Sequence, residues 1–121
     1  MAKNILIVND DLELLQFLTD TLSSKGFNVI QAVEGRKTVS IATDHLPDLI
    51  ILYIDLPDID GIEVAQLNRE NPKTKATPIV AAAGLIFLKE KEKFLQTGFD
   101  DYVAKPISPN EILSAINVLL E

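Results

Sequence analysis

Residues 49–53, with the sequence Leu-Ile-Ile-Leu-Tyr, decide the fold of this 121-residue chain. An unbroken apolar run of this length, rich in branched side chains, is typical of a strand that is covered on both faces. It follows Pro47 and Asp48 and leads into residues 55–61, Asp-Leu-Pro-Asp-Ile-Asp-Gly, which are rich in turn formers. We therefore expect a short central strand of a parallel sheet that ends at Tyr53 in a polar loop.

Strand-like and helix-like segments alternate on both sides of this run. Apolar runs predict further strands at residues 5–8, from residue 29, at 78–82 and at 102–104. The segments between them carry apolar residues at helical spacing: Leu12, Leu15, Leu18 and Leu22; Val39, Ile41 and Ala42; Ile62, Val64, Ala65 and Leu67; residues 88–97; and, after Pro109, Ile112, Ile116 and Leu119. Five such units predict an α/β fold with a parallel sheet and helices on both faces.

Length and composition favour one globular domain over residues 1–121. The chain contains no cysteine, which excludes disulfides and thiolate metal sites. We see no signal peptide and no apolar stretch long enough to span a bilayer, so we expect a cytoplasmic protein without membrane contacts. A formal net charge of −7 argues against nucleic-acid binding by this domain, because neutralising phosphates requires clustered Lys and Arg.

Polar residues follow the predicted strands at the points where functional groups are expected. In open parallel α/β sheets, ligands bind beyond the carboxyl ends of the strands. Four segments meet this condition: Asn9-Asp10-Asp11, residues 53–60, Ala83-Gly84 and Lys105-Pro106.

Three of these segments resemble the receiver domain of two-component response regulators: Asn9-Asp10-Asp11, the Leu-Pro-Asp-Ile-Asp-Gly loop of residues 56–61, and Tyr-Val-Ala-Lys-Pro-Ile at residues 102–107. The resemblance extends over essentially the whole chain. It implies a flavodoxin-like (βα)5 doubly wound sheet of strand order 2-1-3-4-5, and a role in phosphorelay signal transduction instead of enzymatic turnover. It also implies that Tyr53 occupies the position of the aspartate that accepts a phosphoryl group from a histidine kinase.

In receivers the acidic residues after the first strand bind Mg²⁺ together with the acceptor aspartate. Here Asn9 takes the first acidic position, Asp10 is retained and Asp11 follows it. Magnesium requires several converging oxygen ligands, so we expect a degenerate site with weak Mg²⁺ binding at most and no other cofactor. For Asp11 alone we favour capping of the following helix.

Tyr53 has two interpretations. It can be an aromatic plug that fills the vacated pocket, or it can act through its hydroxyl, as a phosphorylation site or by hydrogen bonding to Lys105 or Asp10. We favour the plug, because a phenol with a pKa near ~10 is a poor acceptor from phosphohistidine. Asp55, two residues further on, is the candidate substitute acceptor.

The positions that respond to phosphorylation in the family are also altered. Receivers carry Thr or Ser where Ala83 stands, and the grip of that hydroxyl on the phosphoryl group draws in an aromatic residue matched here by Tyr102. The family's phosphoryl-binding lysine is retained as Lys105, followed by Pro106 in a bond that is usually cis. Without a phosphoryl group, we expect Lys105 to neutralise Asp10.

These positions favour an atypical pseudo-receiver that is independent of phosphorylation and acts through protein–protein interaction. The resemblance implies partners such as a histidine kinase, another receiver or an output domain, bound through the face between the fourth and fifth helices. We expect Leu85, Ile86, Phe87 and Leu88 to contribute a docking patch. The first alternative is a response regulator in which a displaced acid, such as Asp55, accepts the phosphoryl group. The second is a flavin carrier or small enzyme, although the residues after the first strand lack the Ser/Thr-rich phosphate cradle of flavodoxins.

Overall fold

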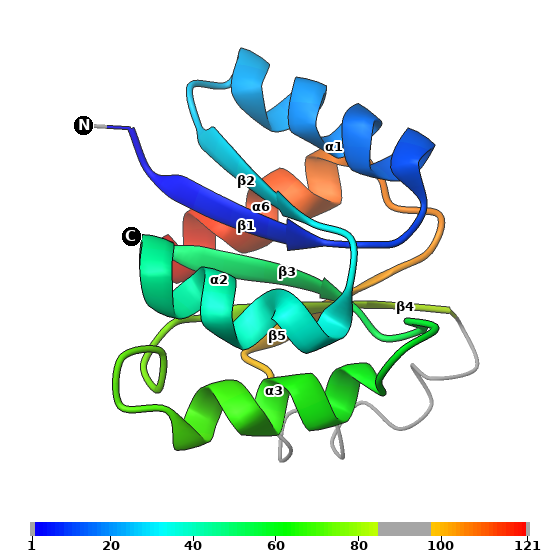
Figure 1. Ribbon diagram of the computed structural model, residues 1–121. Coiled ribbons are helices and arrows are strands. Elements are labelled where there is room, and N and C mark those ends of the chain that lie inside the picture. Colours follow the sequence, from blue (N-terminus) through cyan, green and yellow to red (C-terminus); the bar gives the residue numbers. More distant parts are fainter. Residues whose placement is uncertain (1, 85–97, 121) are drawn as a thin grey trace.

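The computed structural model describes residues 2–84 and 98–120 (Figure 1). Its centre is a parallel sheet of five strands in the order β2-β1-β3-β4-β5. The strands are β1 (Asn4–Val8), β2 (Asn28–Ala32), β3 (Leu49–Tyr53), β4 (Ile79–Ala83) and β5 (Asp101–Ala104). The predicted α/β fold and strand order are confirmed.

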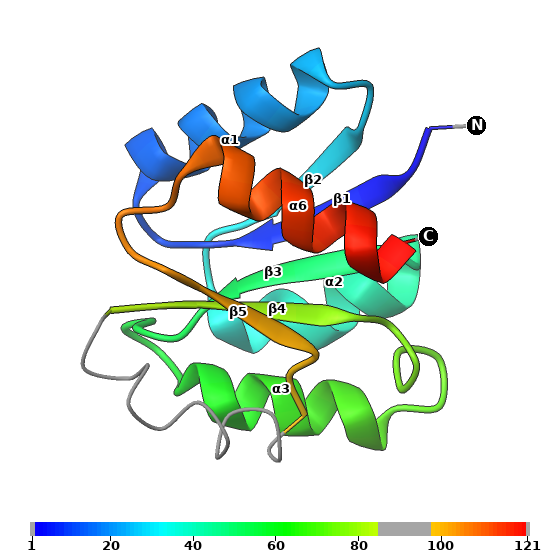
Figure 2. The same ribbon diagram turned by 180° about the vertical axis from the view of Figure 1, so that it is seen from behind.

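Helices cover both faces of the sheet. On one face lie α1 (Leu12–Ser24) and α6 (Pro109–Leu120), and on the other lie the short turn η1 (Gly35–Lys37), α2 (Thr38–His45) and α3 (Gly61–Glu70) (Figures 1 and 2). The hydrophobic core is accordingly divided into two clusters, one beneath α1 and α6 and one beneath α2 and α3. All the strands point toward the same edge of the sheet, which is the edge where we expect the functional residues.

Burial of each strand follows its place in the sheet. Every residue of β3 and β4 is buried, whereas β2 and β5, at the two edges, each bury one residue. The sequence therefore predicted β3 with its observed bounds, while the edge strands begin one residue earlier than expected, at Asn28 and Asp101. The strand expected at 78–82 lies one residue further on, at Ile79–Ala83.

The helical pattern was wrong about one side chain of α1. Leu15, Leu18 and Leu22 are buried as expected, but Leu12 is 68% exposed, because the first turn of the helix begins beyond the end of β1. The predicted helix at 88–97 and the predicted docking patch at 85–88 lie outside the described residues. Within the described ranges, no helix has the length and apolar character needed to cross a membrane.

Candidate functional site

The predicted site residues are brought together at the carboxyl edge of the sheet, where the arrowheads of Figure 1 end. Tyr53 and Ala83 are the last residues of β3 and β4. Asn9 directly follows β1, and Lys105 directly follows β5. Because Val8 pairs with Leu52 in the β1–β3 ladder, Asn9 and Tyr53 emerge side by side.

Tyr53 fills the centre of this edge. Its side chain is 2% exposed and belongs to the core cluster beneath α1 and α6. The ammonium group of Lys105 lies 4.9 Å from the centre of the ring, which is a cation–π contact. Burial, and after it the negative charge of Asp11, raises the pKa of the phenol above its ordinary value, so the side chain is neutral at physiological pH.

Lys105 pairs with a different carboxylate from the one we expected. Its Nζ lies 3.9 Å from Oδ2 of Asp55, and both side chains are partly exposed. Among the described residues the ion pair is therefore with Asp55, which follows β3, and not with Asp10. A pair this open adds little stability by itself. The bond from Lys105 to Pro106 is cis.

The residues after β1 are engaged by the backbone. Oδ1 of Asp11 accepts the N–H groups of Glu13 and Leu14, at 3.0 and 3.3 Å, and so caps α1. Oδ1 of Asn9 accepts the N–H of Asp11 at 3.1 Å, while its buried Nδ2 has no hydrogen-bond partner among the described residues. The Oδ1 atoms of Asn9 and Asp11 are thus committed to backbone N–H groups, which leaves fewer oxygens to face a hard cation. No cluster of three or more metal-ligating side chains occurs in the described part of the chain.

Two acids of the β3–α3 loop, Asp58 and Asp60, accept hydrogen bonds from the backbone. Oδ1 and Oδ2 of Asp58 accept the N–H groups of Gly35 and Arg36, at 3.1 and 3.0 Å, and thereby hold the start of η1. The hydrogen bond from Arg36, more than that from Gly35, holds the pKa of Asp58 below its ordinary range. Asp60 caps α3 through a 2.9 Å bond from the N–H of Ile62.

Gly61, at the end of this loop, lies close to the chain that leaves β3. A Cβ at this position would lie 2.7 Å from the Cα of Ile54, so glycine permits α3 to begin in direct contact with the chain leaving β3. This close approach fixes the loop that carries Asp55 relative to the strand that carries Tyr53.

Ala83 and Tyr102 are joined by packing. Ala83 is fully buried in the cluster beneath α2 and α3, and the partly buried Tyr102 packs against the same cluster. The two residues lie on neighbouring strands, since Ala83 pairs with Ala104 in the β4–β5 ladder. Ala83 offers a methyl group and no hydroxyl at the end of β4.

A groove that the sequence analysis did not find lies between β5 and α6. Its volume is about 420 Å³, and Val118 on its rim is 69% exposed. The lining residues are Asp101, Tyr102, Val103, Asn110, Glu111, Ser114, Ala115 and Val118. In the sequence, the groove is indicated only by the spacing of Glu111, Ala115 and Val118, which places them on one helix face. This face mixes polar and apolar residues and so resembles an ordinary solvated face.

Comparison with known proteins gives consistent matches. The model of the response regulator receiver domain matches residues 5–117. The chain is 34% identical over 116 residues to the DNA-binding dual master transcriptional regulator RpaA of Synechocystis, covering 96% of this chain but 48%, about half, of that protein. It is 28% identical over 120 residues to the polar-differentiation response regulator DivK of Brucella ovis, covering 99% and 98% of the two chains. A chemotaxis response regulator of Vibrio cholerae matches in structure with a TM-score of 0.91 at 25% identity, covering 99% of this chain and 100% of that one.

Proposed function

The chain belongs to the response regulator receiver family, and on that premise we propose that it is an atypical receiver domain over residues 1–121, which signals through protein–protein contacts without taking up a phosphoryl group. Receiver domains act in two-component systems, where they contact signalling proteins such as kinases and output domains. They are signalling proteins and not typical enzymes, so membership of the family leaves the flavin-carrier and small-enzyme interpretations without support.

The observation that carries this proposal is the side chain at the end of β3. An aspartate accepts a phosphoryl group because its carboxylate is an anionic nucleophile. Tyr53 presents a neutral phenol at a position that is 2% exposed, beneath the ammonium group of Lys105. The group at this position is therefore neither ionised nor open to an approaching phosphohistidine.

The surrounding residues support the same proposal. Asn9 and Asp11 use side-chain oxygens to bind backbone N–H groups, and Asp55 faces Lys105. We therefore propose that Mg²⁺ binds weakly at most and that the domain needs no other cofactor. Ala83 provides no hydroxyl to hold a phosphoryl group. The contact that draws in the aromatic residue in other receivers is therefore missing for Tyr102.

We propose that partners bind the surface formed by β5 and α6, which is the described part of the face that the resemblance implies. The groove between β5 and α6 combines the exposed apolar Val118 with the acids Asp101 and Glu111, a mixture suited to a protein partner. A histidine kinase, another receiver or an output domain would fit this role. The net charge of −7 favours a cytoplasmic protein partner over nucleic acid or an acidic membrane surface.

A second candidate function rests on Asp55. Its side chain is 59% exposed and lies beside Lys105, the residue that contacts the phosphoryl group in receivers. A phosphoaccepting regulator that uses this displaced carboxylate is therefore the alternative.

Intact-mass spectrometry after incubation with acetyl phosphate and Mg²⁺ separates the two functions. We expect no phosphoryl adduct on the parent chain, and an adduct on Tyr53→Asp or on the Asn9→Asp/Tyr53→Asp double variant, in which the carboxylates are restored. An adduct on the parent that disappears in Asp55→Asn would establish the alternative. An adduct on the parent that persists in Asp55→Asn would refute both.

A further inference from the structure

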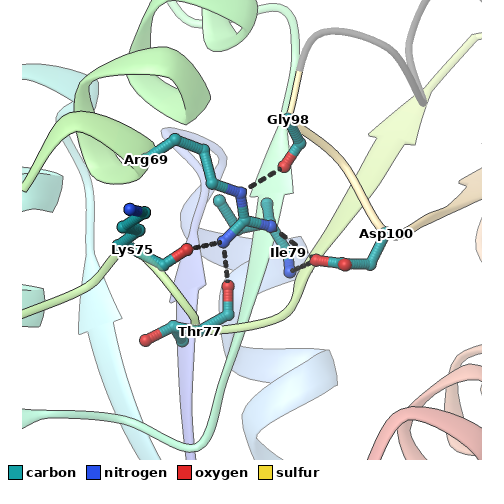
Figure 3. Close-up of polar contacts among 6 residues, drawn as sticks. All are labelled: Arg69, Lys75, Thr77, Ile79, Gly98 and Asp100. Carbon is teal, nitrogen blue, oxygen red and sulfur yellow. Dashed lines mark hydrogen bonds and ion pairs between the residues drawn. The ribbon is translucent and has the colours of Figure 1, made fainter.

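Arg69, in the last turn of α3, places one guanidinium group among three segments of the chain (Figure 3). Its Nε donates to the carbonyl oxygen of Gly98 at 3.0 Å, and its Nη1 donates to those of Lys75 and Thr77 at 3.0 and 2.5 Å. Its Nη2 donates to Oδ2 of Asp100 at 2.6 Å, in a charge-assisted bond. This geometry requires the planar fork of arginine, which a lysine cannot reproduce.

Asp100 extends the contact to β4. Its Oδ2 also accepts the N–H of Ile79 at 2.8 Å (Figure 3). The N–H of Asp100 in turn donates to the carbonyl oxygen of Ile79 at 2.8 Å. Arg69 and Asp100, which we call the clasp, therefore fix the point at which the chain enters the β4–β5 ladder.

The clasp also holds the residues on either side of Phe99. The Phe99 side chain is 3% exposed and packs in the core beneath α2 and α3. Gly98, before it, has φ of 111° and lies against the stem of Arg69, with Cγ of Arg69 3.2 Å from the position of a Cβ. Asp100 follows it. Keeping the clasp closed thus keeps Phe99 in the core.

Beyond this point, within the described part of the chain, β5 is held by its ladder with β4 and by contacts with α6. It is an edge strand that pairs with β4 on one side, and Val103 is its one buried residue. At its other end the N–H of Lys105 donates to the carbonyl oxygen of Ala83 at 2.9 Å, and the ion pair with Asp55 is long and partly exposed. The clasp therefore adds charge-assisted hydrogen bonds that fix the amino end of this strand.

We propose that Phe99 and β5 form a unit that opens separately from the rest of the sheet and that the Arg69–Asp100 clasp holds it shut. Opening displaces Asp101 and Tyr102 from the β5–α6 groove and removes Lys105 from the ring of Tyr53. A contact at the amino end of the sheet thereby controls both the groove and the candidate site at the carboxyl end. This control requires no phosphoryl group and does not depend on which residue accepts one.

Amide hydrogen exchange of the full chain tests the proposal. In Arg69→Gln we expect the β5 amides to exchange about 10- to 100-fold faster than in the parent, the range for losing a hydrogen bond to a charged group. The exchange rates of the β3 amides should change only by the amount that corresponds to the change in global stability, which urea unfolding measures. Arg69→Lys, which keeps the charge but not the fork, should also accelerate β5. The matched control is Lys37→Gln, which breaks an exposed pair with Glu34 and should leave β5 unaffected.

The parent protein provides a second test that does not depend on the variants folding. At low urea concentrations, the β5 amides should exchange through an opening that is less sensitive to denaturant than global unfolding, while the β3 amides follow the global transition. Equal sensitivity of β3 and β5 in the parent, or equal acceleration of both in Arg69→Gln, would show that β5 is part of one cooperative unit and overturn the proposal.

Discussion

Tyr53 ends the central strand with a side chain that is stable there in its neutral form. The ring is 2% exposed, and burial, followed by the negative charge of Asp11, raises the pKa of the phenol. Lys105 contacts the face of the ring, where the attraction comes from the π electrons and does not require a phenolate. We therefore expect the charge of Tyr53 to change with pH only in the alkaline range.

We expect alkaline pH to weaken the fold through Tyr53. A phenol whose folded pKa lies above its unfolded value near ~10 contributes stability that is fully present below that pH. The contribution is lost as the pH rises toward the folded pKa. Above pH ~10, the unfolding free energy of the parent should fall more steeply with pH than that of Tyr53→Phe. The difference in slope should reach about 1.4 kcal/mol per pH unit. Urea unfolding of both proteins between about pH 8 and pH 11 measures this difference, and parallel curves would contradict it.

Leu46 is a second residue whose backbone predicts a measurable effect. It ends α2 with φ of 48°, in the left-handed region where a Cβ is unfavourable, and its side chain is 57% exposed. Leu46→Gly should raise the unfolding free energy by about 0.5 kcal/mol, because relief of the left-handed strain exceeds the added freedom of the unfolded chain. Asp44→Gly, at an exposed position inside the same helix, should lower it instead. A loss of stability in Leu46→Gly, measured by urea unfolding, would show that the left-handed strain costs less than the freedom that glycine adds to the unfolded chain.

At the scale of elements, short loops of this fold are fixed by side chains that accept backbone hydrogen bonds. Asp11 caps α1, Asp60 caps α3, and Asp58 reaches across to the start of η1. The third contact is different in kind, because it joins residues far apart in the sequence and so fixes the β3–α3 loop against the β2–α2 connection. The strength of this contact depends on the charge of one partly exposed carboxylate, that of Asp58.

Acid should therefore weaken the contact between Asp58 and η1. The N–H of Arg36 holds the pKa of Asp58 below its ordinary range, so its contribution is present above the unfolded pKa near ~4 and is lost as the pH falls through the folded value. Between about pH 5 and pH 3 the melting temperature of the parent should fall further than that of Asp58→Asn. Asp44→Asn controls for the loss of one negative charge. Equal falls in the parent and Asp58→Asn would mean that the hydrogen bonds do not depend on ionisation.

The sequence predicted β3 with its observed bounds but placed β4, which is equally buried, one residue too early. β3 is covered by apolar residues on both faces, so its residues form a continuous run and its bounds were predicted as observed. β5 buries one of its four residues, and its apolar run is shorter than the strand itself. The contact of Asp58 with Gly35 and Arg36, like that of Arg69 with Asp100, links distant residues whose proximity exists only once the sheet has formed.

At the scale of the whole molecule, the position of the candidate site could be predicted but its internal contacts could not. Parallel strands deliver their carboxyl ends to one edge, which is why Asn9, Tyr53, Ala83 and Lys105 converge there. The choice of Asp55 over Asp10 as the partner of Lys105 depends on how far each loop extends from that edge. Spacing along the sequence contains no information about that distance.

The packing at this edge predicts how Tyr53→Asp, which restores the family's acceptor, affects stability. Tyr53→Asp removes a fully packed ring and its contact with Lys105, and places a carboxylate in the cluster beneath α1 and α6, near the negative charge of Asp11. Replacing a large aromatic side chain in a core costs about 3–5 kcal/mol, and burying a charge adds to that cost, although Lys105 offsets part of it. In EDTA we therefore expect the variant to lose several kcal/mol of the ~5–15 kcal/mol typical of a domain.

Two further variants separate the causes of that loss. Tyr53→Phe keeps the ring and should stay close to the parent, while Tyr53→Leu loses volume without gaining charge and should fall between the parent and Tyr53→Asp. If the restored carboxylate completes a cation site, Mg²⁺ should raise the stability of Tyr53→Asp and leave Tyr53→Leu unchanged, because a ligand stabilises only the state that binds it. Urea unfolding with Mg²⁺ and with EDTA makes both comparisons. A Tyr53→Asp protein as stable as the parent in EDTA would mean that this edge tolerates a carboxylate as well as a phenol, and the packing of Tyr53 would then give no reason for the loss of the acceptor.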